Sequence, residues 1–137
     1  MSNSYNCILL VDDDAITNEF HKDLVKKLNR FENISSFNSS TDALSYLKEC
    51  VRTKEKLPSV FMIGIMMPVI DGFELMDELN EMYEQHGETD LPKFIIISSP
   101  NHNRDQEKFV LLPNKKAYII KPMDKSKLEA AMDSIEN

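Results

Sequence analysis

The chain has 137 residues, of which 42% are hydrophobic and 28% are charged, and its formal net charge is −7. This length and composition fit one globular domain with a sizeable core, and an acidic chain without a basic run argues against nucleic-acid binding. No apolar run is long enough to cross a bilayer and the first residues lack the features of a signal peptide, so we expect a cytoplasmic protein without a membrane partner.

Five apolar runs predict β-strands. In chain order they are Cys7 to Val11, Ile34 to Phe37, Ser59 to Ile63, Lys93 to Ile97 and Ala117 to Ile120. All except the second are continuous rather than alternating. Continuous apolar runs are typical of strands that are covered on both faces in a parallel sheet.

Helical patterns separate these strands, because apolar residues recur at helical spacing in the first, third and last intervals. They are Ile16, Phe20, Leu24 and Leu28, then Phe73, Met76, Leu79 and Tyr83, and finally Leu128, Ala131, Met132 and Ile135. Ser40 or Thr41 is expected to cap a second helix. A fourth helix is expected near Arg104 to Leu112, and Pro113 ends it.

Strands that alternate with helices predict five successive βα units. Right-handed crossovers place helices on both faces of one sheet, so the predicted fold class is α/β, with a doubly wound five-stranded parallel sheet. Such sheets hold their sites at the carboxyl ends of the strands, beside the point where the strand order reverses. We expect residues 1–137 to form this single domain, without an output domain.

An acidic run, Asp12 to Asp14, follows the first strand. Adjacent carboxylates repel each other unless a cation lies between them, and Mg²⁺ prefers oxygen ligands. Asp12 and Asp13 therefore predict a metal site. Asp14 is expected to cap the following helix, because a cap accounts for one aspartate but not for three in a row.

The later strands also end in polar residues, Ser98 and Ser99 after the fourth and Lys121 after the fifth. Lys121 can direct its ammonium at an anion, and Ser98 offers a hydroxyl donor. Each alone is weak evidence, since a serine or lysine is common at a strand end. Because the carboxyl ends of parallel strands meet at one edge of the sheet, these residues and the acidic run are expected to form a single site.

Together these residues resemble the receiver domain of two-component response regulators, over nearly the whole chain from Ile8 to the last helix. The resemblance implies the flavodoxin-like (βα)5 fold, with strand order 2-1-3-4-5. It also implies that Asp12 and Asp13 bind Mg²⁺ together with the backbone carbonyl of Met66. Ser98 and Lys121 would contact a phosphoryl group, and Tyr118 would swing between exposed and buried positions.

Gly64 departs from this pattern, because the resemblance places the phosphoacceptor aspartate four residues before Pro68. Glycine has no nucleophile for an aspartyl phosphate, and a lost metal ligand lowers the expected affinity for Mg²⁺. We then expect Lys121 to contact Asp12 or Asp13. One explanation is a pseudo-receiver that acts through protein–protein interaction. Another is a point change in a receiver whose parent carries aspartate, which the otherwise intact site favours.

The implied partners are a histidine kinase or a phosphotransfer protein. The resemblance also implies a possible homodimer through the face formed by the fourth helix, fifth strand and fifth helix, where Lys125 and Lys127 lie. A substitute acceptor would be Ser98, Ser99 or His102.

An enzymatic alternative is a phosphatase of the haloacid dehalogenase type, with Asp12 as nucleophile and Asp14 as general acid. It is disfavoured because Ile16 occupies the Thr/Val position of that motif. We therefore expect no autonomous enzyme.

Overall fold

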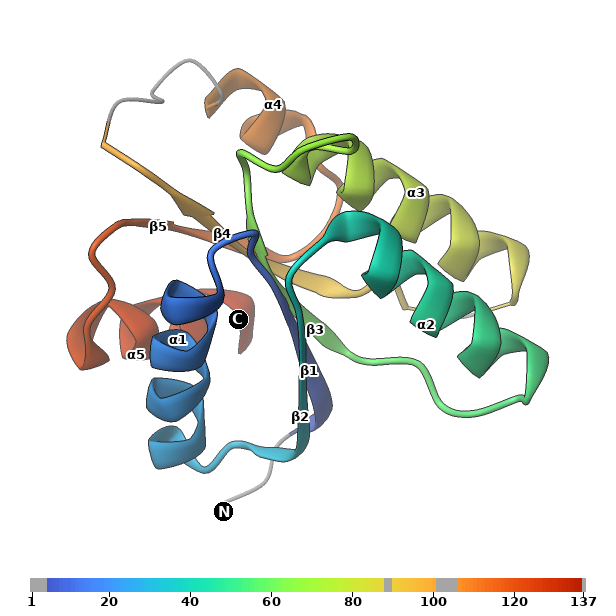
Figure 1. Ribbon diagram of the computed structural model, residues 1–137, viewed down its shortest axis with the longest axis horizontal. Coiled ribbons are helices and arrows are strands. Elements are labelled where there is room, and N and C mark those ends of the chain that lie inside the picture. Colours follow the sequence, from blue (N-terminus) through green and yellow to red (C-terminus); the bar gives the residue numbers. More distant parts are fainter. Residues whose placement is uncertain (1–4, 88–89, 101–105, 137) are drawn as a thin grey trace.

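The computed structural model describes residues 5–87, 90–100 and 106–136, in which strands and helices alternate along the chain (Figure 1). The strands are β1 (Tyr5–Val11), β2 (Phe31–Phe37), β3 (Val60–Gly64), β4 (Lys93–Ser98) and β5 (Lys116–Ile120). The helices are α1 (Ala15–Leu28), α2 (Ser40–Arg52), α3 (Gly72–Gln85), α4 (Gln106–Leu111) and α5 (Lys125–Glu136). Each predicted strand is present, and each has at least one bound shifted by one to three residues.

The strands form one all-parallel sheet in the order β2-β1-β3-β4-β5, as predicted. Helices α1 and α5 cover one face, and α2, α3 and α4 lie on the other side (Figure 1). This is the doubly wound, flavodoxin-like arrangement, whose sites lie at the carboxyl ends of the strands. No helix among residues 5–87, 90–100 and 106–136 combines the length and the apolar character that crossing a bilayer requires.

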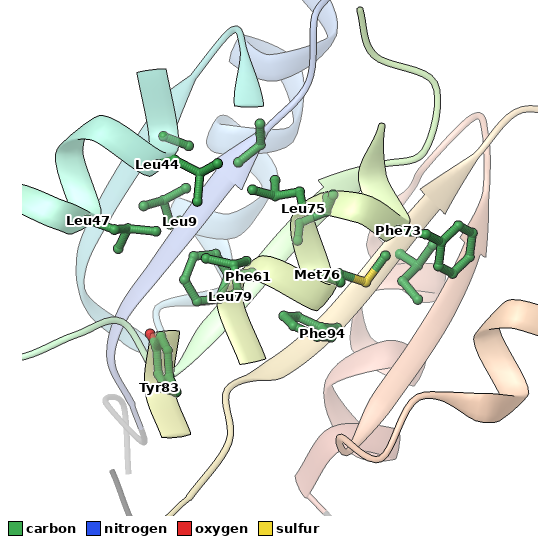
Figure 2. Packing of buried hydrophobic residues seen from close by; sticks show 14 of the residues in the cluster. Leu9, Leu44, Leu47, Phe61, Phe73, Leu75, Met76, Leu79, Tyr83 and Phe94 are labelled. Atoms are coloured by element: carbon green, nitrogen blue, oxygen red, sulfur yellow. The ribbon is translucent and has the colours of Figure 1, made fainter. Parts of the chain in front are cut away.

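Two apolar clusters fill the space between the sheet and its helices, because successive strand residues face opposite sides. Along β1, Leu9 and Val11 join the cluster beneath α2 and α3, which Figure 2 shows around Phe61 and Leu79. Ile8 and Leu10 join the cluster beneath α1 and α5. Burial on both faces explains the continuous apolar runs of the sequence.

The predicted apolar stripes of the third and last helices are confirmed, since all eight of their residues are buried. The stripe assigned to α1 is confirmed only in its second half, where Leu24 and Leu28 are partly buried and pack against the cluster beneath α1 and α5. Ile16 is 82% exposed and Phe20 is 50% exposed, whereas Asn18, His21 and Val25 are the buried residues. A strict four-residue spacing advances by about 40° around the helix at each step. The four predicted residues therefore do not share one face of the helix, and the first two are exposed while the last two pack against the core.

The cap of α2 also differs from the expectation. Ser39, rather than Ser40 or Thr41, is the N-cap, and its hydroxyl accepts a hydrogen bond of 3.1 Å from the amide of Asp42. Ser40 is buried instead, and its hydroxyl donates to the carbonyl of Ile70 at 2.8 Å. Three consecutive hydroxyl residues can each accept from a helix amide, so the sequence alone did not choose among them.

Helix α4 is described from Gln106 to Leu111 and ends two residues before Pro113, whereas its predicted start at Arg104 lies outside the described residues. The ammonium of Lys116 donates to the carbonyls of Val110 and Leu112 and so satisfies the end of this helix. His102, one of the substitute acceptors considered from the sequence, lies outside the described residues.

Candidate functional site

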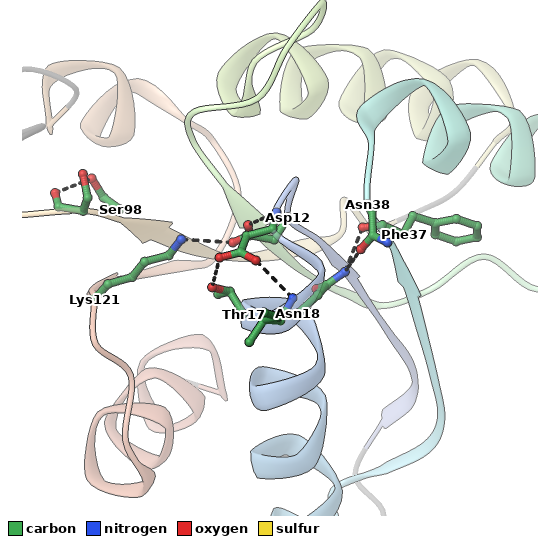
Figure 3. A network of polar contacts seen from close by, with 10 residues as sticks. Asp12, Thr17, Asn18, Phe37, Asn38, Ser98 and Lys121 are labelled. Atoms are coloured by element: carbon green, nitrogen blue, oxygen red, sulfur yellow. Dashed lines mark hydrogen bonds and ion pairs between the residues drawn. The ribbon is translucent and has the colours of Figure 1, made fainter.

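The residues predicted from the strand ends meet at one edge of the sheet (Figure 3). The register of β3 pairs Gly64 with Ile97 of β4, next to Ser98. The amide of Lys121 donates to the carbonyl of Ser98 at 2.7 Å, so the ends of β4 and β5 are adjacent. The parallel sheet thus gathers residues that are far apart in the sequence into one site.

Asp12 is the central residue of this site and is almost completely buried. One carboxylate oxygen, Oδ1, accepts a hydrogen bond of 3.0 Å from the amide of Asp14. The other, Oδ2, lies 3.2 Å from Nζ of Lys121, in an ion pair that is not aligned as a hydrogen bond. The expected attraction of Lys121 to the acidic run is confirmed at Asp12. Desolvation strengthens such a contact and also makes its loss costly.

The other two aspartates of the run face solvent. Asp14 is the N-cap of α1, as predicted, and its carboxylate accepts from the amide of Ile16 at 3.1 Å and from the hydroxyl of Thr17 at 2.8 Å. The hydrogen bond from Thr17, followed by the one from Ile16, lowers the pKa of Asp14. Asp14 is thereby committed to the helix terminus. Asp13 is therefore the exposed aspartate of the run that does not cap the helix.

The backbone at Gly64 runs directly beside the Asp12 carboxylate. A Cβ atom at position 64 would lie 3.1 Å from Asp12 Oδ2, which is tighter than ordinary van der Waals contact. The following loop is pinned close to the strand end, because the amide of Gly72 donates to the carbonyl of Ile65 at 2.8 Å. A Cβ on Gly72 would meet the carbonyl oxygen of Gly64 at 2.6 Å, so only glycine fits there.

The remaining predicted residues are Ser98, Tyr118 and Met66, and their side chains have three different environments. The hydroxyl of Ser98 is buried and donates to the carbonyl of Ser99 at 3.1 Å. The ring of Tyr118 is partly buried and packs edge-on against Phe109, with 5.3 Å between the ring centroids. The side chain of Met66 is 60% exposed.

Two polar residues of α1 belong to this region and were missed from the sequence. Asn18 donates from Nδ2 to the carbonyl of Phe37 at 2.9 Å and to Oδ1 of Asn38 at 3.1 Å, which ties α1 to the end of β2 (Figure 3). His21 is buried, and its burial lowers its pKa, while Asp12 and Lys121 act on it in opposite directions. Asn18, His21 and Val25 have helical spacing, but two of the three are polar, so a search for apolar residues at that spacing does not find this buried face.

Known proteins resemble this chain along most of its length. The family model described as "response regulator receiver domain" matches residues 8–133. The probable C4-dicarboxylate response regulator DctR of Halalkalibacterium halodurans is 25% identical over 129 residues, which are 94% of this chain and 50% of that protein. This chain therefore spans about half the length of the curated relative that it matches.

Solved structures agree with the sequence match. A two-component response regulator from Cytophaga hutchinsonii is 29% identical, with a TM-score of 0.77, and the match covers 97% of this chain and 98% of that one. The receiver domain of a histidine kinase from Arabidopsis thaliana, solved with Mg²⁺ and BeF₃⁻, has the same fold at 22% identity. Its TM-score is 0.73, and the match covers 96% of this chain and 89% of that one. The chain belongs to the family of response regulator receiver domains of two-component signal transduction.

Proposed function

We propose that this receiver domain does not accept a phosphoryl group at the usual position and that it acts through protein–protein interaction. The observation that carries the proposal is Gly64 at the end of β3, the position that the resemblance to receiver domains assigns to the acceptor aspartate. Formation of an aspartyl phosphate requires a carboxylate nucleophile at that position. Gly64 supplies none, and the carboxylate of Asp12 lies beside its backbone instead.

The neighbouring groups are poor substitutes for the missing nucleophile. Asp12 is buried and its carboxylate is held by the Asp14 amide and by Lys121. The hydroxyl of Ser98 already donates to the backbone carbonyl of Ser99, and its one hydrogen bond in the described structure is not with a basic side chain. A serine hydroxyl without a base is a weak nucleophile. We therefore propose that none of these side chains replaces the acceptor.

The donor set also fits Mg²⁺ poorly, and we propose weak binding at most. Three donors were expected, namely Asp12, Asp13 and the Met66 carbonyl. Both oxygens of Asp12 are engaged, and Lys121 already supplies a positive charge beside it. Within the described part of the chain, no group of three or more His, Cys, Asp or Glu residues lies close enough together to hold a metal ion. Mg²⁺ ordinarily needs carboxylates with free oxygens.

Receiver domains interact with histidine kinases or phosphotransfer proteins, and we propose a partner of this kind for the present chain. We further propose that the face formed by α4, β5 and α5 is available for a partner or a second copy. Val110 and Leu111 of α4 are 69% and 81% exposed, and Lys125 and Lys127 of α5 are also exposed. Exposed apolar residues beside charged ones are typical of such contact surfaces.

A second candidate is a point-changed form of a normal phosphorylated receiver. The position of Lys121 at the sheet edge, beside Ser98 and the acidic run, favours it, because these groups are the partners of a phosphoryl group in the family. A dehalogenase-type phosphatase is less well supported, since its required general acid, Asp14, is occupied as the cap of α1.

The test is to incubate the chain with acetyl phosphate and Mg²⁺ and to measure its intact mass after an acid quench. We expect no gain of a phosphoryl group. A stable gain would overturn the proposal, and peptide mapping would then assign the acceptor to Ser98, to the acidic run or to another residue. A family member that carries the acceptor aspartate serves as the positive control for the donor.

A further inference from the structure

A pair of thiols lies on the α2 side of the sheet, away from the site described above. Leu9 and Val11 of β1 pack in the cluster beneath α2 and α3. Because strand residues two apart share a face, Cys7 faces the same side of the sheet. Cys50, in the last turns of α2, is 3% exposed and belongs to that same cluster. The two cysteines thus lie on the same side of the sheet, Cys7 on a strand and Cys50 on the helix that packs against that face.

The surroundings of the two thiols overlap. Tyr46 lies one helical turn before Cys50, and the neighbouring Cys50 thiol is the largest cause of the raised pKa of Tyr46. Cys7 and Tyr46 line one cavity of about 680 Å³ together with Ser35. Burial raises the pKa of Cys7, the Ser35 hydroxyl lowers it, and the charge of Cys50 raises it again. Cys7, Ser35 and Tyr46 therefore surround one cavity, and Tyr46 connects it to Cys50 one helical turn away.

We propose that Cys7 and Cys50 form a reversible intramolecular disulfide when the protein meets a peroxide. Cys7 reacts first, because it is partly exposed and lines the cavity, whereas Cys50 is buried. The Cys7 thiolate attacks one oxygen of hydrogen peroxide, the O–O bond breaks, and hydroxide leaves, which gives a sulfenic acid. The Cys50 thiolate then attacks the Cys7 sulfur, and a second hydroxide leaves as the S–S bond forms.

The reaction balances as two thiols and one peroxide giving one disulfide and two waters, with the thiol protons taken up by the two hydroxides. Both thiols are oxidised and the peroxide is reduced. An added dithiol reverses the reaction by exchange. Since thiolate is the reacting form and burial raises the pKa of Cys7, oxidation should be faster at mildly alkaline pH than at neutral pH.

This inference is independent of the proposed function. Cys7 lies at the start of β1, whereas Asp12 follows the carboxyl end of the same strand. A cross-link between β1 and α2 would not involve the residues at the carboxyl edge of the sheet. The outcome of the thiol experiment therefore says nothing about phosphoryl transfer, and failure of either proposal can be told from failure of the other.

The test uses the whole chain, reduced, desalted and treated with hydrogen peroxide at mildly alkaline pH. We expect the monomer to lose the mass of two hydrogen atoms and to become inert to N-ethylmaleimide after denaturation. Peptide mapping should recover a linked Cys7–Cys50 pair, and dithiothreitol should restore both thiols. Cys7→Ser and Cys50→Ser are the matched controls, and neither should show the loss.

The rate of disulfide formation is a second test of whether the two thiols lie near each other in the folded chain. The disulfide should form faster in the folded chain than in the same chain denatured in urea, because folding holds the thiols near each other. Three results would each overturn the proposal. They are two thiols that still react with N-ethylmaleimide after treatment, disulfide-linked dimers in place of the internal cross-link, and faster disulfide formation in urea than in the folded chain. Glutathione treated in parallel confirms that the oxidant was active.

Discussion

Oδ2 of Asp12 lies 3.2 Å from Nζ of Lys121, although these residues follow β1 and β5, and both β3 and β4 lie between those strands in the sheet. The contact crosses the end of β3 at Gly64, where a Cβ atom would lie 3.1 Å from the same oxygen (Figure 3 shows the ion pair). With no side chain at position 64, the Lys121 ammonium and the Asp12 carboxylate pair directly across the end of β3. Lys121 supplies the positive charge beside the buried carboxylate.

Removing the lysine charge should destabilise the protein. Lys121→Met leaves Asp12 buried without its counter-charge, which typically costs several kcal/mol for a fully buried pair. Because the Lys121 side chain is 33% exposed, we expect a smaller loss, about 1–3 kcal/mol in the free energy of unfolding measured with urea. Adding Asp12→Asn should recover part of the loss. Equal losses in the single and double variants would show that the ion pair does not carry the effect.

Val69 should be replaceable by glycine with a gain in stability. Its φ angle is 69°, in the left-handed region that β-branched residues rarely adopt, and its side chain is 86% exposed. Val69→Gly relieves this strain but increases the entropy of the unfolded chain, so the expected net gain is about 0.5–1 kcal/mol. Thermal unfolding measures it. Val69→Ala is the control, and a gain from alanine equal to that from glycine would contradict the backbone explanation.

A buried amide pair joins α3 to the loop before β5. Asn114 donates to Oδ1 of Asn80 at 2.8 Å and to the carbonyl of Pro92 at 2.6 Å, and Asn80 donates back at 2.9 Å. Asn114→Ala leaves both partners unsatisfied and should cost about 2–3 kcal/mol. Asn80→Ala leaves the Pro92 contact in place and should cost less. Urea denaturation of the two variants compares them, and the reverse order would refute this reading of the network.

His21 should make stability depend on pH below neutrality. Burial lowers its pKa below the ordinary value of 6.5, with Asp12 and Lys121 nearby as opposing charges. The unfolded chain therefore binds the proton first as the pH falls, and the stabilisation from the neutral imidazole is present above about pH 6.5 and lost below it.

We expect His21→Gln to flatten the fall of unfolding free energy between about pH 7 and 5.5, whatever its effect at neutral pH. The absolute stability of the variant is not the readout, because the glutamine also changes packing on α1. An unchanged slope in His21→Gln would assign the pH dependence to other groups.

Most of the fold was predictable because the strands are buried on both faces and leave continuous apolar runs. The site residues were predictable because parallel strands bring their carboxyl ends to one edge. The buried face of α1 was not, since Asn18 is buried to satisfy the carbonyl of Phe37, a contact that no periodicity reveals. Neither was the partner of Lys121, because its choice of Asp12 over Asp13 depends on which carboxylate is buried.

The most direct test of the proposed function restores the missing carboxylate. Wild type, Gly64→Ala and Gly64→Asp are each treated with acetyl phosphate and Mg²⁺, and their intact masses are compared. Gly64→Ala controls for crowding by the added Cβ, which would lie 3.1 Å from Asp12 Oδ2. We expect one added phosphoryl group on Gly64→Asp and none on the other two proteins. Labelling of the wild type, or a folded Gly64→Asp that stays unlabelled, would overturn the proposal.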